Sequence, residues 1–239
     1  MRRLLALVVG AAALVVSVQA QFLPVGQACS EEEYDDYLAV LLSSGAEEAA
    51  DAAHRFERRW PGSALAAGVL TLRLDACRAL GDRECLIEAG RRALESSRNN
   101  VPVLVALAST LPNQSEDPQE WTEAAAYAGR ALEALEDFHP PVTTPLEDWL
   151  ALEARLKAEA RAALGLVRFK QGRVREAVEL FEQAVNGAPA PDPAQIYRLG
   201  KLYQLKNRTA EAERMFRRLL ELPNEALRER ARQELRLSP

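Results

Sequence analysis

Apolar residues recur at helical spacing along almost the whole chain after residue 30, and short turn motifs interrupt them at regular intervals. Alanine, leucine, arginine and glutamate dominate the composition, and all four favour helix. Short connections between helices of similar length indicate antiparallel hairpins stacked in series. We therefore expect an all-α fold, with helices at residues 31–43, 46–60, 63–80, 82–97, 101–111, 119–137, 145–171, 173–187, 192–206, 208–222 and 224–236.

One hairpin pattern occurs twice near the C-terminus, at residues 158–191 and again at 193–226. A glycine in the first helix of each copy lets the second helix pack closely, because a larger side chain would push the helix axes apart. Alanine at that glycine should cost little, since alanine is the better helix former. An alanine in the second helix fills the opposing space, and a phenylalanine four residues later closes the gap to the next hairpin. These packing positions are Gly165, Ala177 and Phe181 in the first copy and Gly200, Ala212 and Phe216 in the second.

This pattern resembles the tetratricopeptide repeat, a helix-turn-helix unit of about 34 residues. More divergent copies occupy residues 31–60, 63–100 and 101–137. The resemblance implies a right-handed α-solenoid of about five hairpins over residues 31–238. The charged last helix, at residues 224–236, then serves as its C-terminal cap.

The N-terminus has the pattern of a secretory signal peptide at residues 1–20. Two arginines precede an uncharged run of 15 residues, and Val18-Gln19-Ala20 places compact residues before a cleavage site after Ala20. Residues 21–30 then form a short leader. No second hydrophobic run follows, so we expect a periplasmic or secreted protein with no membrane span after cleavage.

Two other interpretations of the N-terminus stay open. The first is an uncleaved membrane anchor, for which about 20 apolar residues are needed. The second is a lipid anchor on Cys29, although the residues before this cysteine lack the expected leucine.

Charge and motif content exclude several function classes. The chain has 30 basic and 35 acidic residues, a net charge of −5, and the two signs are interleaved, so we expect no nucleic-acid partner. Its two histidines, His54 and His139, lie far apart in sequence. The chain has none of the common metal, phosphate or nucleophile motifs. We therefore expect no catalytic residues, no cofactor and no metal, and hence no enzyme.

Cys77 and Cys85 lie on either side of the turn at Leu80-Gly81. Facing residues in a helical hairpin can approach the ~5.5–6 Å between Cα atoms that a disulfide needs, and an oxidising compartment would permit the bond. The alternative is that both are small buried apolar residues. A bridge between them would leave Cys29 unpaired.

The resemblance also implies where a partner would bind, since the first helices of successive tetratricopeptide repeats line a concave groove. The version of this groove that holds a C-terminal carboxylate is absent, because Ala162, Leu166 and Ala194 replace three of its five polar residues. An aromatic and aliphatic strip edged with cations remains, suited to an extended or helical segment with some acidic character. An equal alternative is that Leu166 and Phe169 only pack the long preceding helix. The candidate partner-binding residues are Leu166, Phe169, Lys170, Tyr197, Arg198 and Lys201.

Two function hypotheses follow. The first is an exported adaptor or scaffold that binds a protein or peptide in the cell envelope through the repeat groove. The second is a structural component that self-associates into a homo-oligomer and has no peptide ligand. The sequence identifies neither the partner nor the pathway. A sedimentation experiment would separate the two, because self-association alone gives a defined oligomer without ligand.

Overall fold

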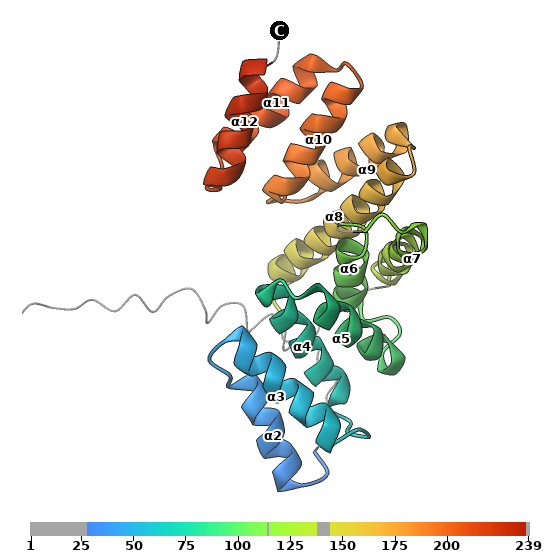
Figure 1. The fold of residues 1–239 in the computed structure, drawn as a ribbon, viewed down its shortest axis with the longest axis vertical. Coiled ribbons are helices and arrows are strands. Elements are labelled where there is room, and N and C mark those ends of the chain that lie inside the picture. Colours follow the sequence, from blue (N-terminus) through green and yellow to red (C-terminus); the bar gives the residue numbers. More distant parts are fainter. Residues whose placement is uncertain (1–27, 114, 138–143, 238–239) are drawn as a thin grey trace, which may run out of the picture. The chain divides into compact units, whose positions relative to one another are not determined.

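The computed structural model describes residues 28–113, 115–137 and 144–237, so the expected signal peptide and His139 lie outside the described residues. These residues are all-helical, and every helix expected from the periodicity is present with ends within three residues of the expected ones. The chain folds as two compact units, one up to Ser97 and one from Arg98, which are coloured blue to teal and green to red in Figure 1.

The first unit contains two hairpins. Its helices are α2 (Glu31–Leu41), α3 (Ala46–Arg59), α4 (Ala66–Leu80) and α5 (Arg83–Ser96). The apolar faces of α2, α3 and α4 meet in a core around the fully buried ring of Phe56, against which Tyr37 packs edge-on at 6.5 Å between ring centroids. The turn between α4 and α5 depends on Gly81, whose φ of 70° lies in the left-handed region that favours glycine.

Helix α4 begins three residues later than the sequence predicts. The hydroxyl of Ser63 accepts a capping hydrogen bond of 2.9 Å from the backbone of Leu65, but residues 64–65 form a turn before the helix begins at Ala66. The Ser63 carbonyl also accepts the N–H of Ala66 at 3.1 Å. Ser63 therefore stabilises a turn before the helix, and the first backbone groups of α4 follow that turn.

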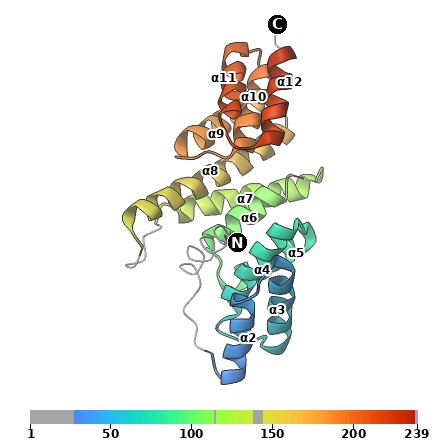
Figure 2. The same cartoon turned by 90° about the vertical axis from the view of Figure 1, so that its left-hand side faces the viewer.

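The second unit contains three hairpins and a last single helix. Its helices are α6 (Val101–Thr110), α7 (Pro118–Ala134), α8 (Leu146–Lys170), α9 (Val174–Gly187), α10 (Pro193–Leu205), α11 (Thr209–Leu220) and α12 (Glu225–Leu237). Figure 2 shows α10, α11 and α12 packed side by side, as their contacts require. One continuous core joins α8 to α12 and is built around Phe181 and Phe216, both fully buried.

Local signals in the sequence set the ends of these helices. Asp117 and Asp192 cap the start of α7 and α10 by accepting backbone N–H groups, and a proline occupies the first turn of each. The turns that follow α8 and α10 pass through Gly172, with a φ of 75°, and Asn207, with a φ of 57°. The two C-terminal hairpins thus use the same turn conformation at corresponding places.

Candidate functional site

The repeat glycines lie directly against the phenylalanine rings of their own hairpins. A Cβ added to Gly165 would lie 2.9 Å from Cδ2 of Phe181, and one added to Gly200 would lie 2.6 Å from Cε1 of Phe216. Ala177 and Ala212 are fully buried in the same core. The helices of each hairpin therefore approach so closely that only a hydrogen atom fits between backbone and ring.

This contact adds to the role expected for the phenylalanines. The sequence predicts that they close the gap to the next hairpin, and each ring also fills the space that the glycine of its own hairpin leaves. The prediction that alanine is tolerated at these glycines is wrong for Gly200, because the Phe216 ring is 0% exposed and a Cβ at 2.6 Å requires it to move.

The candidate partner-binding residues lie on two helices that begin successive hairpins. Leu166, Phe169 and Lys170 lie on α8, and Tyr197, Arg198 and Lys201 lie on α10. We call this set the first-helix face. Leu166 and Tyr197 are partly buried against the core that joins α8 to α12, whereas Phe169 is 42% exposed. Phe169 is thus the large apolar residue of the face that remains in contact with solvent.

Lys170 is held by the connection between α6 and α7. Its Nζ donates to the backbone carbonyl of Ser115 at 3.0 Å and to the carboxylate of Glu116 at 2.6 Å. It also lies 5.5 Å from the centroid of the Trp121 ring, a cation–π contact. The same Ser115 carbonyl accepts the indole N–H of Trp121 at 2.9 Å. The side chain of Lys170 is consequently only 14% exposed.

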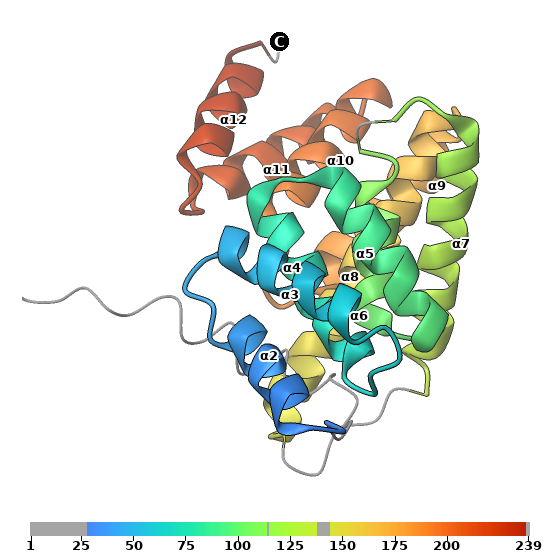
Figure 3. The same ribbon diagram turned by 60° about the horizontal axis from the view of Figure 1, so that its bottom comes forward.

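Arg198 reaches the same connection from α10. It donates to Oδ1 of Asn113 at 2.7 Å, across 85 residues of sequence. Burial lowers the pKa of the Arg198 guanidinium, and the nearby carboxylate of Asp192 partly opposes that shift. Lys170 and Arg198, which belong to successive hairpins, therefore converge on one short connection, whose green ribbon lies next to α10 in Figure 3.

Tyr197 and Lys201 have a different internal partner, Glu234 of the terminal helix α12. The Tyr197 hydroxyl and the Lys201 ammonium both donate to the Glu234 carboxylate, at 3.0 Å and 2.9 Å. Burial raises the pKa of the Tyr197 hydroxyl, and its hydrogen bond to Glu234 raises that pKa further. The Tyr197 ring also packs against Phe216 at 5.9 Å between centroids. These two residues thus help to hold α12 on α10.

The comparisons with known proteins support the repeat assignment. A family model described as tetratricopeptide repeat matches residues 168–233, from the end of α8 into α12, which include Gly200 and Phe216. Residues 168–233 therefore belong to the tetratricopeptide-repeat family. No curated protein matches its sequence.

Solved tetratricopeptide-repeat structures share the fold. MamA from Desulfovibrio magneticus RS-1 superposes with a TM-score of 0.59 at 17% identity, covering 82% of this chain and 97% of that one. The protein TTC0263 from Thermus thermophilus gives 0.53 at 21% identity, covering 86% and 100%. PilF from Pseudomonas aeruginosa gives 0.56 at 17% identity, covering 82% and 78%. At such identities the likeness concerns the fold alone.

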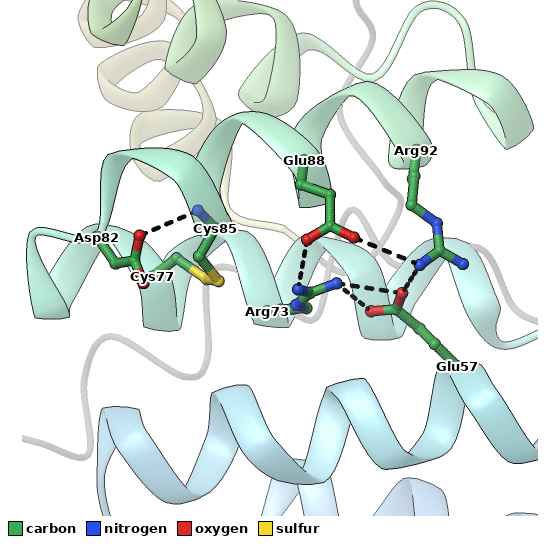
Figure 4. Close-up of a disulfide and its surroundings, with 7 residues drawn as sticks. All are labelled: Glu57, Arg73, Cys77, Asp82, Cys85, Glu88 and Arg92. Carbon is green, nitrogen blue, oxygen red and sulfur yellow. Dashed lines mark hydrogen bonds and ion pairs between the residues drawn. A yellow bond between two sulfur atoms is a disulfide. The ribbon is translucent and has the colours of Figure 1, made fainter.

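The second hairpin of the first unit, formed by α4 and α5, contains the cysteine pair. A disulfide joins Cys77 at the end of α4 to Cys85 at the start of α5, with their Cα atoms 5.7 Å apart (Figure 4). Asp82 caps α5 by accepting the backbone N–H of Cys85 at 3.0 Å. Cys29 is free and exposed. The bridge and the cap together fix the turn at Gly81.

A charged cluster lies beside this disulfide in the same hairpin stack. Glu57 of α3 is 2% exposed and pairs with Arg73 of α4, at 3.2 Å, and with Arg92 of α5. Arg73 also donates to Glu88 at 2.8 Å (Figure 4). Each buried charge therefore has partners of opposite sign on neighbouring helices, as burial requires. We interpret this cluster as a structural link between three helices, which the sequence alone did not indicate.

The part of the chain that the structure describes was compared with the requirements of a metal site and of a membrane-spanning helix. No group of three or more His, Cys, Asp or Glu residues is placed there to hold a metal ion. None of its helices combines the length and the apolar character needed to cross a membrane.

Proposed function

We propose that the protein is an exported, non-catalytic scaffold that binds a protein or peptide partner through the first-helix face. Stacked helical repeats present extended surfaces that suit this role. The observation that carries the proposal is Phe169. Phe169 is 42% exposed, whereas Phe181 and Phe216 of the hairpin cores are buried. Aromatic residues are frequent anchors of protein interfaces.

Export is proposed from two features. The arginines and apolar run at residues 1–20 have the pattern of a secretory signal, with cleavage expected after Ala20. The disulfide between Cys77 and Cys85 suits an oxidising compartment such as the bacterial periplasm. N-terminal sequencing of the mature protein should begin at Gln21, and an intact Met1 in a membrane fraction would reverse the proposal of export.

A site-specific crosslinking experiment tests the binding face. An aromatic photo-crosslinking residue in place of Phe169 should capture a defined partner in living cells. The matched control places the same residue at Glu179, an exposed position on α9, the second helix of that hairpin. Capture from position 179 but not from 169 would show that the working surface lies elsewhere.

Self-association is the second candidate function, and the crosslinking experiment also distinguishes it. If the captured partner is another copy of this chain, and sedimentation shows a defined oligomer without added ligand, the protein is a structural component rather than an adaptor.

A further inference from the structure

The connection between α6 and α7 occupies the cationic part of the first-helix face. We call its described residues Asn113 and Ser115–Asp117 the acceptor segment. Its Ser115 carbonyl and Glu116 carboxylate accept from Lys170, and its Asn113 side chain accepts from Arg198. These are the acceptor groups that an extended acidic peptide would offer to the same two cations.

The acceptor segment is anchored at both ends. Leu111 and Pro112 are buried on one side, and Asp117 caps α7 on the other by accepting the backbone N–H of Gln119 at 2.9 Å. Between these anchors the Glu116 side chain is 85% exposed. Its contact with Lys170 can therefore break without unfolding either flanking helix.

Release costs the Glu116 carboxylate little, because its side chain is 85% exposed and water solvates it well once it is freed. The lysine, by contrast, is 14% exposed and remains beside the Trp121 ring and the Ser115 carbonyl. A competing acidic segment would thus meet a cation that is already positioned, once Glu116 has moved away.

We propose that the acceptor segment is autoinhibitory: Glu116 and Asn113 cover Lys170 and Arg198 until an extended acidic peptide displaces them. This inference rests on the proposed function, since it assumes that the first-helix face binds a partner. The inference adds that the partner is acidic and that the acceptor segment of the same chain competes with it.

The first measurement tests whether the acceptor segment shields Lys170 from solvent, and it needs no partner. Wild type and the double variant Asn113→Ala, Glu116→Ala are treated briefly with an amine-acetylating reagent, and lysine modification is quantified by mass spectrometry. Lys206, which is exposed, serves as the internal reference. Acetylation of Lys170 relative to Lys206 should rise about tenfold in the variant, as expected when contacts of charged hydrogen-bond strength are lost. An unchanged ratio would overturn the proposal.

The second measurement tests whether the acceptor segment competes with an acidic peptide for Lys170 and Arg198. Fluorescence anisotropy with a labelled oligoglutamate peptide should show about tenfold tighter binding to the double variant than to wild type. The control variant Glu133→Ala removes an exposed carboxylate from the far end of α7 and should leave the affinity unchanged. Glu116→Gln is a milder second variant, and circular dichroism should show wild-type helix content for all three.

The outcomes separate the two hypotheses. If Lys170 becomes reactive but peptide affinity does not rise, the acceptor segment covers the lysine without inhibiting binding, and the proposal fails. If the peptide binds neither protein, the first-helix face does not take an acidic partner and the proposal fails, while the proposed function, which rests on Phe169, is decided separately by the crosslinking experiment.

Discussion

Gly200 on α10 lies against the Phe216 ring of α11, with only 2.6 Å between a Cβ built on the glycine and Cε1 of the ring. Gly165 and Phe181 make the corresponding contact one hairpin earlier. The spacing of each hairpin in the C-terminal repeats therefore depends on a glycine that no other residue can replace without moving a buried ring.

Replacing Gly200 with alanine should destabilise the protein by about 1–3 kcal/mol, because overpacking of the fully buried Phe216 outweighs the better helix propensity of alanine. Gly129→Ala is the matched control, since a Cβ on that helical glycine of α7 meets nothing within 4 Å. The control should be neutral or stabilising by up to ~1 kcal/mol. Urea unfolding measures both. Equal stability of the two variants would contradict the close contact, and Phe216→Leu should partly rescue Gly200→Ala.

Removing Glu57 should destabilise the first unit strongly, because Arg73, whose side chain is 7% exposed, would lose its buried partner. Glu57→Ala should cost about 3–5 kcal/mol, as for other buried pairs broken on one side. Glu88→Ala removes the second carboxylate that pairs with Arg73. Because the Glu88 side chain is 53% exposed, this change should cost under about 1 kcal/mol. Thermal unfolding followed by circular dichroism compares them. Similar losses for both variants would show that burial of Glu57 does not matter.

The Cys77–Cys85 bridge should survive in protein recovered under native conditions. Thiol counting after denaturation without reductant should find one free cysteine, Cys29. Cys77→Ala, Cys85→Ala should lower the free energy of unfolding by about 2.5 kcal/mol, because the open chain regains the entropy of a short loop. Cys29→Ala is the control and should unfold as wild type does. Three free thiols in protein purified without reductant would exclude the bridge.

Acid should weaken the contact of Glu234 with α10. Burial acts to raise the pKa of Glu234, but hydrogen bonds from Lys201, Tyr197 and Gln204 outweigh it and hold that pKa below its ordinary value of 4.5. Since the folded pKa is the lower one, this stabilisation is complete above the unfolded pKa and is lost as pH falls through the folded value. The stability difference between wild type and Glu234→Gln should therefore be largest at about pH 7 and shrink below about pH 4. Glu221→Gln, at an exposed position, is the control, and a difference independent of pH would contradict the assignment.

The sequence predicted the helices well because their signals are local. Apolar periodicity and turn residues act within a few residues, and the caps that the structure shows at Asp117 and Asp192 are equally local. The repeated spacing of Gly165 and Gly200 also located the two hairpins. By contrast, the cost of alanine at Gly200 could not be predicted from helix propensity, because it depends on a ring on another helix.

The partners of the first-helix face could not be predicted, because they are distant in sequence. Lys170 meets Glu116 across 54 residues, and Arg198 meets Asn113 across 85. The signal available in the sequence was the connection at 112–118, which contains Glu116 and Asp117 and is longer than the other connections between helices of a hairpin. These contacts also change how the face should be tested, since replacing Tyr197 would disturb α12 as well as any partner.

Equilibrium binding of the crosslinked partner to wild type and Phe169→Ala tests the central claim most directly. Phe169 is 42% exposed, so its removal should preserve helix content, which circular dichroism checks, and Leu42→Ala, at a position that is 77% exposed in the first unit, is the control. If the first-helix face binds the partner, Phe169→Ala should weaken binding by about 1–3 kcal/mol while Leu42→Ala leaves it intact. A folded Phe169→Ala protein that binds its partner as tightly as wild type would contradict the account.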